Sequence, residues 1–273
     1  MSTNESDEGI ENIEKFPVLF LSRSHSGKIA VPTFSSHSPI WRLIPFIEAS
    51  GAVQMAIDRW IFDRYCRGEM PPTIRFYTWE PAAISLGYHQ RRFPESWRSL
   101  TCHGKPIDLV RRPTGGRAVL HQGDLCYAIV TSEMGESRDR TYETLCEFLI
   151  QGWRSLGIEL HYGHAERGYI GQPGCFSTAT AADLVTAQGQ KAIGSAQLRR
   201  DRTILQHGSM ILSSPSSLYQ QVFGDTASAP IWGDSSAIPV PVILEALTEA
   251  ARHCFAVDFA IEPLSETEWQ EIF

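Results

Sequence analysis

The chain has 273 residues, 42% of them hydrophobic and 20% charged, which is typical of a globular protein with a sizeable buried core. Its formal net charge of −7 argues against a general nucleic-acid binder, because such proteins usually carry a basic surface. No apolar run approaches the roughly 20 residues that span a bilayer. The segment 1–15 is acidic and polar, unlike a secretion signal, so we expect a cytoplasmic protein that binds neither nucleic acid nor membrane.

The first third of the chain predicts a tail followed by a strand, a helix and two further strands. Residues 1–37 are rich in Ser, Glu and Asn, which is typical of a flexible N-terminal tail, and residues 38–273 are expected to form a single domain. The expected elements are a strand at 41–44, a helix at 50–66 that ends before Gly68, and strands at 74–79 and 84–89.

The remaining chain alternates between strands and helices. A loop at 111–117 connects two strands, and an amphipathic helix is expected at 141–156. Strands at 184–185, 192–198 and 203–212, joined by tight turns, predict an antiparallel arrangement. A late helix is expected at 242–254 and a turn of helix at 266–273. This order favours an α+β fold with a mixed or mostly antiparallel central sheet and flanking helices.

The loop at 111–117 has the composition of a ligand-binding loop. Gly115 and Gly116 have no Cβ, so their backbone can take positive φ and lie directly against a ligand. Arg111, Arg112 and Arg117 add fixed positive charge, which suits a carbonyl or phosphate group. Thr114 is expected to cap the loop, and His121 is expected to satisfy the backbone or to bind a ligand carbonyl.

The six cysteines are widely spaced and contain no CxxC pair, which predicts neither a zinc site nor a disulfide framework. Cys126 and Cys146 lie in apolar runs and are expected to be buried. Cys175 instead follows Pro173 and Gly174 in an irregular segment. The pairs His161/His164 and Cys102/His103 lack further ligands at matching spacing, so we interpret them as surface or structural residues.

Three segments together resemble the lipoate and biotin protein ligase superfamily, and within it the cysteine-dependent octanoyltransferases of the LipM type. These segments are 111–130, 173–176 and 189–210, and the resemblance extends over about residues 40–255. It implies a biotin/lipoate protein ligase-like catalytic domain, with helices packed against one side of a curved sheet and the ligand on the other.

The resemblance also implies the catalytic residues. Cys175 falls at the position of the acyl-accepting cysteine, and Lys191 lies in the lysine motif of the superfamily. A lysine ammonium near the thiol would lower its pKa and stabilise the oxyanion of the tetrahedral intermediate, and a neutral lysine could later act as a base. The expected substrate-binding residues are Arg111, Arg112, Thr114, Gly115, Gly116, Arg117, His121, Gly194, Ser195, Gln197 and His207.

The implied reaction is transfer of an octanoyl group from octanoyl-acyl carrier protein, through an acyl-cysteine thioester, to a lysine of a lipoyl-accepting protein. The expected acceptor is the glycine cleavage H protein or a 2-oxoacid dehydrogenase subunit, and no metal, ATP or other cofactor is expected. Both partners are typically small and acidic in this family, which fits the arginine clusters at 91–98, 111–117 and 199–202.

Three alternatives remain open. An ATP-dependent lipoate–protein ligase would use Lys191 on the activated carboxylate and leave Cys175 without a role. Arg117 replaces the third glycine of the ligase motif and Gln122 replaces its acidic residue, which favours the transferase. An amidotransferase would differ only in its donor, and a non-catalytic lipoyl-domain-binding subunit would dispense with the pairing of Cys175 and Lys191.

Overall fold

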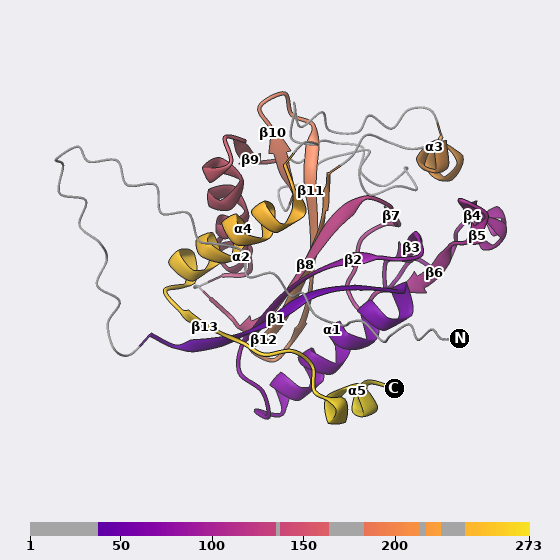
Figure 1. The fold of residues 1–273 in the computed structure, drawn as a ribbon. Coiled ribbons are helices and arrows are strands. Elements are labelled where there is room, and N and C mark those ends of the chain that lie inside the picture. Colours follow the sequence, from indigo (N-terminus) through magenta and orange to yellow (C-terminus); the bar gives the residue numbers. More distant parts are fainter. Residues whose placement is uncertain (1–37, 135–136, 164–182, 213–216, 225–237) are drawn as a thin grey trace, which may run out of the picture. The chain divides into compact units, whose positions relative to one another are not determined.

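The computed structural model describes residues 38–134, 137–163, 183–212, 217–224 and 238–273 (Figure 1). The predicted tail at 1–37 and Cys175 lie outside these residues, so the tail and the domain boundary stay predictions. The helices are α1 Gly51–Cys66, α2 Arg138–Ser155, α3 Ser217–Phe223, α4 Val240–Phe255 and α5 Glu266–Ile272, with a short 3-10 helix, η1, at Glu95–Ser99. The strands are β1 Ile40–Ala49, β2 Thr73–Trp79, β3 Ala83–Leu86, β4 Thr101–Cys102, β5 Lys105–Pro106, β6 Asp108–Arg111, β7 Val119–His121, β8 Asp124–Ser132, β9 Leu160–Tyr162, β10 Leu184–Thr186, β11 Lys191–Arg200, β12 Thr203–Ile211 and β13 Asp258–Ile261.

A large mixed sheet forms the centre of the domain, with the strand order β13-β1-β2-β8-β12-β11-β10-β9. Strand β1 pairs in parallel with both β13 and β2. The pairings from β2 through β8, β12, β11 and β10 to β9 are antiparallel. The predicted α+β fold with a mostly antiparallel sheet and flanking helices is therefore confirmed.

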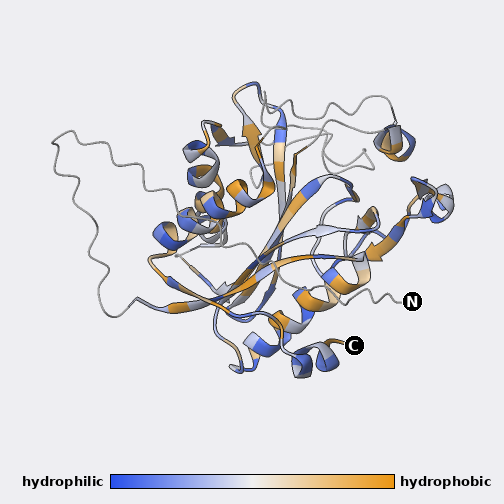
Figure 2. Ribbon diagram, viewed as in Figure 1, coloured by the Kyte–Doolittle hydropathy of each residue, from blue (hydrophilic) through white to orange (hydrophobic). Residues whose placement is uncertain are grey.

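Helices cover both faces of this sheet (Figure 1). Because side chains alternate along a strand, β8 sends Tyr127 and Ile129 into the core with α2 and α4. Cys126 and Ala128 point to the opposite face and pack with α1. The expectation of helices on one side only was wrong, since the apolar stripe of α1 needs its own sheet face to cover it. Hydrophobic and hydrophilic residues alternate along these helices, as amphipathic packing requires (Figure 2).

The boundaries of α1 follow from its capping residues. The Ser50 hydroxyl accepts a hydrogen bond from the backbone N–H of Val53 at the start of the helix. Gly68 has a φ of 70° just beyond its end, a left-handed conformation that glycine adopts without steric cost. The sequence-predicted helix at 50–66 is confirmed, and so are the helices at 141–156, 242–254 and 266–273 to within a few residues.

A small sheet with the order β6-β3-β7 carries the glycine-containing loop. The strand predicted at 84–89 ends earlier, at Leu86, because Gly87 lies against the backbone of this loop. A Cβ at Gly87 would overlap the carbonyl oxygen of Gly116. The strand therefore stops where the loop from residues 112–118 crosses it.

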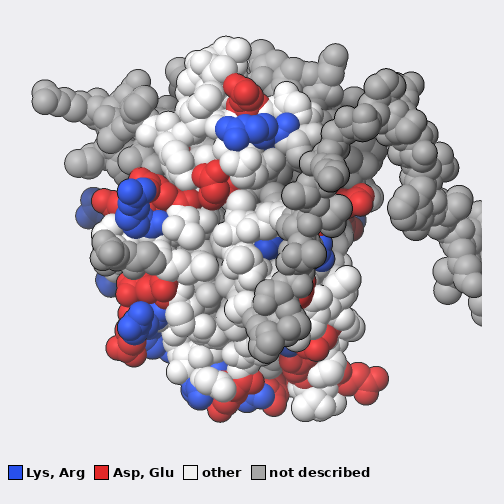
Figure 3. Space-filling model, turned by 90° about the vertical axis from the view of Figure 1, so that its left-hand side faces the viewer, with Lys and Arg blue, Asp and Glu red and all other residues white. Residues whose placement is uncertain are grey.

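The surface around α2, α4 and β13, on the left-hand side of Figure 1, carries acidic and basic side chains interspersed among uncharged ones (Figure 3). No helix among the described residues is long and apolar enough to cross a bilayer. Cys126 and Cys146 are buried as predicted, and the cysteines in the described segments are free thiols.

Candidate functional site

The two arginines that open the glycine loop act as internal braces for the backbone. Arg111 Nη1 donates to the carbonyl oxygens of Gly87 at 2.7 Å and Gln90 at 2.8 Å. The guanidinium of Arg112, which is buried, donates to the carbonyl oxygens of Ser85 at 2.8 Å and Arg117 at 2.7 Å. Many of the N–H groups that were expected to bind a ligand thus donate to backbone carbonyl oxygens and hold the loop in place. Arg112 also lines the pocket.

The two loop glycines have different environments. Gly116 has a φ of 90°, which favours glycine, and a Cβ at this position would lie 2.8 Å from Arg112 Nη2, so both conformation and space favour glycine. At Gly115, no atom of the described residues lies within 4 Å of the position of a Cβ. Gly116 borders the main pocket, whereas Gly115 borders a separate groove outside the loop.

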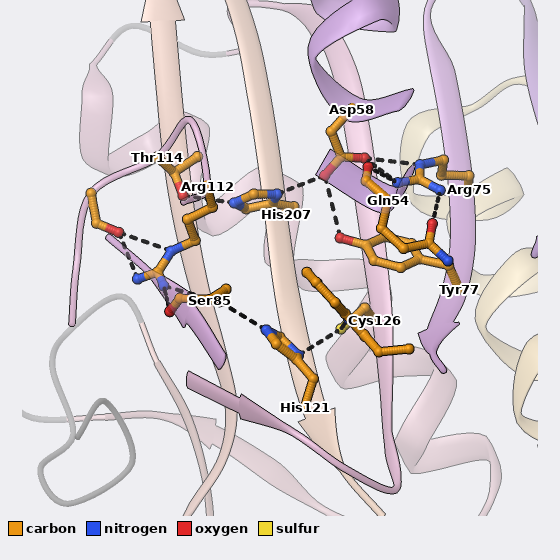
Figure 4. Close-up of polar contacts among 12 residues, drawn as sticks. Gln54, Asp58, Arg75, Tyr77, Ser85, Arg112, Thr114, His121, Cys126 and His207 are labelled. Carbon is orange, nitrogen blue, oxygen red and sulfur yellow. Dashed lines mark hydrogen bonds and ion pairs between the residues drawn. The ribbon is translucent and has the colours of Figure 1, made fainter. Parts of the chain in front are cut away.

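A buried hydrogen-bonded chain connects the loop to the sheet and to α1 (Figure 4). Thr114 Oγ1 lies 2.6 Å from His207 Nε2 on β12, and His207 Nδ1 lies 2.8 Å from Asp58 Oδ2 on α1. Asp58 Oδ1 accepts from Arg75 Nη2 at 2.6 Å, and Arg75 Nη1 donates to Gln54 Oε1 at 2.7 Å. Thr114 was expected to cap its own loop; its hydroxyl instead bonds a histidine from the central sheet.

The pKa shifts in this chain fix its protonation. Burial lowers the pKa of His207 and outweighs the opposing effect of Asp58. Burial by itself would raise the pKa of Asp58, but Arg75 and His207 together bring it below its ordinary value. A neutral His207 has one N–H, which the carboxylate of Asp58 accepts, so Nε2 accepts the hydroxyl proton of Thr114.

A second buried cluster lies where β7 turns into β8. His121 Nδ1 lies 2.7 Å from Asp124 Oδ2, and the Sγ of Cys126 lies 3.2 Å from the same oxygen. The His121 ring stacks on Trp79 with ring centroids 3.9 Å apart, and its Nε2 lies 2.8 Å from Ser85 Oγ. His121 thus bonds side chains, not the backbone groups favoured from the sequence.

This cluster unites three kinds of potential metal-ligand atom. Atoms of His121, Asp124 and Cys126 all lie within 4.8 Å of one another. Burial and the neighbouring Asp124 raise the pKa of the Cys126 thiol well above its ordinary value. Burial opposes ionisation of Asp124, but His121 and the hydrogen bond from Ser209 bring the pKa of Asp124 below its ordinary value.

Lys191 begins β11 and forms a buried ion pair with Asp183, which directly precedes β10. Their Nζ and Oδ1 atoms are 2.9 Å apart, and both side chains are at least 95% buried. The antiparallel pairing of β10 with β11 places the two residues together. Because both residues also line a cavity, the pair can contact a ligand that enters it.

A pocket of about 570 Å³, including its open mouth, joins these groups. Its apolar wall includes Met55, Tyr77, Trp79 and Val119. Its polar wall includes Arg112, His121, Asp183, Lys191, Ser195 and His207. The small residues Gly194 and Gly208, on the paired strands β11 and β12, also line the pocket.

The structure brings most of the sequence-predicted site residues to this pocket. Those that line it are Arg112, Gly116, His121, Lys191, Gly194, Ser195 and His207. Gly115 and Gln197 border the outer groove, and Arg111, Thr114 and Arg117 support the loop without lining either. Cys175 lies outside the described residues, so its meeting with Lys191 stays a prediction.

The hairpin side chains are partly structural. Ser195 Oγ lies 2.8 Å from the hydroxyl of Tyr127, which also accepts from Gln206 Nε2 at 2.9 Å. Gln197 Nε2 in turn donates to Gln206 Oε1 at 2.6 Å. These contacts connect β11, β12 and β8 and hold the pocket wall in register.

Sequence reasoning missed Asp58 and Asp183. Asp58 is a carboxylate within the apolar stripe of α1, four residues after the buried Gln54, and such an acid on a core-facing stripe requires a buried partner. Asp183 directly precedes a short apolar strand, a weaker signal. Partners from strands far along the chain cannot be assigned to either residue from a single sequence.

The family of this chain follows from comparison with known proteins. Residues 50–241 match the model of the lipoyl protein ligase A/B catalytic domain, and the chain belongs to this family. Relatives named octanoyltransferase LipM include those of Kyrpidia tusciae and Clostridioides difficile. The first is 38% identical and covers 66% of this chain and 69% of the relative. The second is 42% identical and covers 63% and 65%.

A third LipM relative, from Lysinibacillus sphaericus, is 32% identical over 81% of this chain and 88% of its own length. Because these relatives are octanoyltransferases, the chain is an acyltransferase. Among solved structures, a lipoate protein ligase from T. acidophilum with bound lipoic acid has a TM-score of 0.68 at 21% identity, covering 85% of this chain and 92% of that one. A lipoate-protein ligase A bound with ATP has the same TM-score and coverage at 22% identity. These likenesses show the fold.

Proposed function

We propose that the protein is an octanoyltransferase of lipoate biosynthesis. It moves an octanoyl group from acyl carrier protein, through a thioester on Cys175, to a lysine of a lipoyl-accepting protein. The observation that carries the proposal is the buried Lys191–Asp183 pair in the lining of a pocket that also has apolar lining residues. The name shared by the bacterial relatives supports the identity of the acyl group.

The pocket suits an acyl chain with a polar end. Met55, Trp79 and Val119 offer apolar surface to the hydrocarbon, which is favourable by roughly 0.8 kcal/mol for each buried CH₂. The lysine lies among the polar groups, where the carbonyl of the chain would be held. Gly116 keeps the loop backbone close to this position because it has no side chain.

The proposed chemistry proceeds in two exchanges. The thiolate of Cys175 attacks the thioester carbonyl, its S–C bond forms, and the S–C bond to the phosphopantetheine thiol breaks. The acceptor amine then attacks the acyl-cysteine, an amide C–N bond forms, and the cysteine thiol is released after the amine loses a proton. Splitting one transfer into two steps in this way is nucleophilic catalysis.

Lys191 would act in both exchanges. Its positive charge favours the thiolate of Cys175 and the oxyanion of each tetrahedral intermediate, and Asp183 orients the ammonium. Only seven residues of sequence separate Cys175 from Asp183. A connection of this length allows the cysteine to reach the ion pair.

The outer groove offers a surface for the proteins that deliver and accept the acyl group. It lies on the other side of the glycine loop and is lined by Arg59, His89, Arg199 and Arg200, among others. Asp63 pairs with Arg200 and Glu133 with Arg199, so part of this charge is neutralised within the protein. The expected donor is octanoyl-acyl carrier protein, and the expected acceptor is the glycine cleavage H protein or another lipoyl domain.

Intact-mass measurement tests the proposal. Mixing the protein with octanoyl-acyl carrier protein should add one octanoyl group, located by peptide mapping to Cys175 and removed by hydroxylamine. The variant Cys175→Ser should form no such adduct, whereas Cys102→Ser, at a half-buried cysteine outside the main pocket, should form it normally. An undiminished adduct on Cys175→Ser, or an adduct that forms only from free octanoate and ATP, would contradict the proposal.

A further inference from the structure

The His121–Asp124–Cys126 cluster has no role in the proposed transfer, although it forms part of the pocket wall. His121 ends β7 and Asp124 begins β8, and the turn between them contains Gly123 with a φ of 71°. Cys126 follows two residues after Asp124, so both side chains lie on the same face of β8. This tight turn brings a nitrogen, an oxygen and a sulfur atom together, with His121 and Cys126 at the pocket surface.

The separations of these atoms are equal to or slightly shorter than those of ligands around one metal ion. Zinc bonds of about 2.0–2.3 Å at near-tetrahedral angles separate the ligand atoms by roughly 3.3–3.7 Å. Here Cys126 Sγ lies 3.6 Å from His121 Nδ1 and 3.2 Å from Asp124 Oδ2. The hydrogen-bonded atoms of His121 and Asp124, at 2.7 Å, would have to separate slightly when a cation replaces the proton between them.

Each of the three side chains already has an outer hydrogen-bond partner. Ser85 Oγ lies 2.8 Å from His121 Nε2, the nitrogen that faces away from the cluster. Trp79 Nε1 donates to Cys126 Sγ at 3.1 Å, and Ser209 Oγ donates to Asp124 Oδ2 at 2.6 Å. Partners of this kind orient metal ligands and stabilise their deprotonated forms.

Asp124 carries an independent sign of a missing partner. Its Oδ2 receives the contacts from His121, Cys126 and Ser209, whereas its Oδ1 is buried and has no hydrogen-bond partner among the described residues. A buried carboxylate oxygen without a partner is costly, and a bound ion is one way to satisfy it.

We propose that His121, Asp124 and Cys126 form a binding site for a thiophilic divalent cation such as Zn²⁺, and that a cation bound there closes the pocket to the acyl chain. Sulfur, imidazole and carboxylate together select zinc-like ions over magnesium or calcium. On binding, Cys126 releases its thiol proton to solvent and becomes a thiolate ligand. His121 binds through the Nδ1 lone pair and keeps its single proton on Nε2, where Ser85 Oγ accepts it.

The inhibitory consequence rests on the proposed octanoyl transfer. A cation on His121 and Cys126 would stand on the pocket wall beside Trp79, with its open coordination position facing the cavity. Placing charge and bound water among apolar side chains opposes entry of a hydrocarbon chain. Zinc should therefore inhibit acylation in competition with the acyl donor, and a chelator should reverse the inhibition.

Cobalt spectroscopy tests the site independently of activity. Co²⁺ added to the full-length protein should produce the near-ultraviolet absorption of a thiolate–cobalt bond, and Zn²⁺ should remove it. The variant Cys126→Ser should lose this absorption, whereas Cys254→Ser, at a half-buried cysteine on α4, should retain it. No absorption in the unmodified protein, or full absorption in Cys126→Ser, would overturn the proposal.

A second variant tests the site in case Cys126→Ser does not fold. Asp124→Asn keeps the size of the side chain and should weaken Co²⁺ binding by roughly tenfold or more. If Asp124→Asn and the unmodified protein bind Co²⁺ with equal affinity, Asp124 is not a metal ligand. If the protein binds cobalt but Zn²⁺ does not inhibit acylation, the metal site stands and only the proposed closing of the pocket is wrong. If the protein binds cobalt but transfers no octanoyl group in the absence of metal, the metal site stands and only the proposed function is wrong.

Discussion

The Asp58–Arg75 and Asp183–Lys191 ion pairs are both buried, but their surroundings differ. Asp58 is bonded at both oxygens, by Arg75 on one side and by His207 and Tyr77 on the other. Neither Asp58 nor Arg75 borders the pocket, whereas Asp183 and Lys191 both do. The charges of the first pair are neutralised by partners within the protein, whereas the charges of the second pair can also contact a ligand in the cavity. Burial alone thus does not mark a catalytic group; access to a cavity separates the two pairs.

The strongest test of this difference is removal of the lysine. Lys191→Met should lower the rate of octanoyl transfer by roughly 10²–10⁴-fold, the range for loss of one acid–base or charge-stabilising group. Asp183 can then take up a proton or a water from the pocket, so the protein should remain folded. Rates are measured with octanoyl-acyl carrier protein, and folding is checked by thermal unfolding. The control Lys105→Met alters an exposed lysine on β5 and should leave the rate unchanged; a normal rate in Lys191→Met would remove the lysine from the mechanism.

The matching change in the other pair should act on stability. Asp58→Asn leaves the guanidinium of Arg75 buried without its counter-charge, which costs about 3–5 kcal/mol. Urea unfolding measures this loss, and transfer activity per folded molecule should fall far less than in Lys191→Met. Asp63→Asn on the same helix breaks only an exposed pair with Arg200 and should cost less than about 1 kcal/mol. Similar stabilities of Asp58→Asn and Asp63→Asn would show that the buried pair does not hold the fold.

The glycine loop is hydrogen-bonded to the Asp58–Arg75 pair through Thr114 and His207, so changes in the loop should also act on stability. Gly87→Ala places a methyl group against the carbonyl oxygen of Gly116, so the loop must shift, at a cost of about 1–3 kcal/mol. In Gly115→Ala the new methyl group has no atom of the described segments within 4 Å, so stability should change by less than about 0.5 kcal/mol. Thermal or urea unfolding of the two variants distinguishes them. Equal effects would mean that the close approach of the two backbones is not required.

The sequence predicted the helices, the antiparallel hairpins and the lysine motif because each depends on local periodicity or on residues close together in the chain. It did not predict the partners of the charged groups. Arg112 looked like a ligand-binding charge, yet it bonds the loop's own carbonyl oxygens, and Thr114 bonds His207, 93 residues away. Helices on both sheet faces also escaped the prediction, since the apolar stripe of α1 does not reveal which face it covers. Long-range pairing decides the partner of Thr114 and the placement of the helices, whereas the partners of Arg112 depend on how the loop itself folds.

The smallest expected effect is the pH dependence of stability through His207. Its pKa is lowered in the folded protein, so below the ordinary value of about 6.5 the unfolded chain binds a proton that the folded chain does not. Stability is therefore fully present above pH 6.5 and is lost as the pH falls towards the folded pKa, by at most about 1.4 kcal/mol for each pH unit. The lowered pKa values of Asp58 and Asp124 act only below the ordinary carboxyl value of 3.8 and leave this range unaffected. Urea midpoints at pH 7.5 and 5.5 should differ less in His207→Gln than in the unmodified protein, whereas His161→Gln, at an exposed histidine, should keep the full difference. An equal pH response in His207→Gln would show that the titrating group lies elsewhere in the protein.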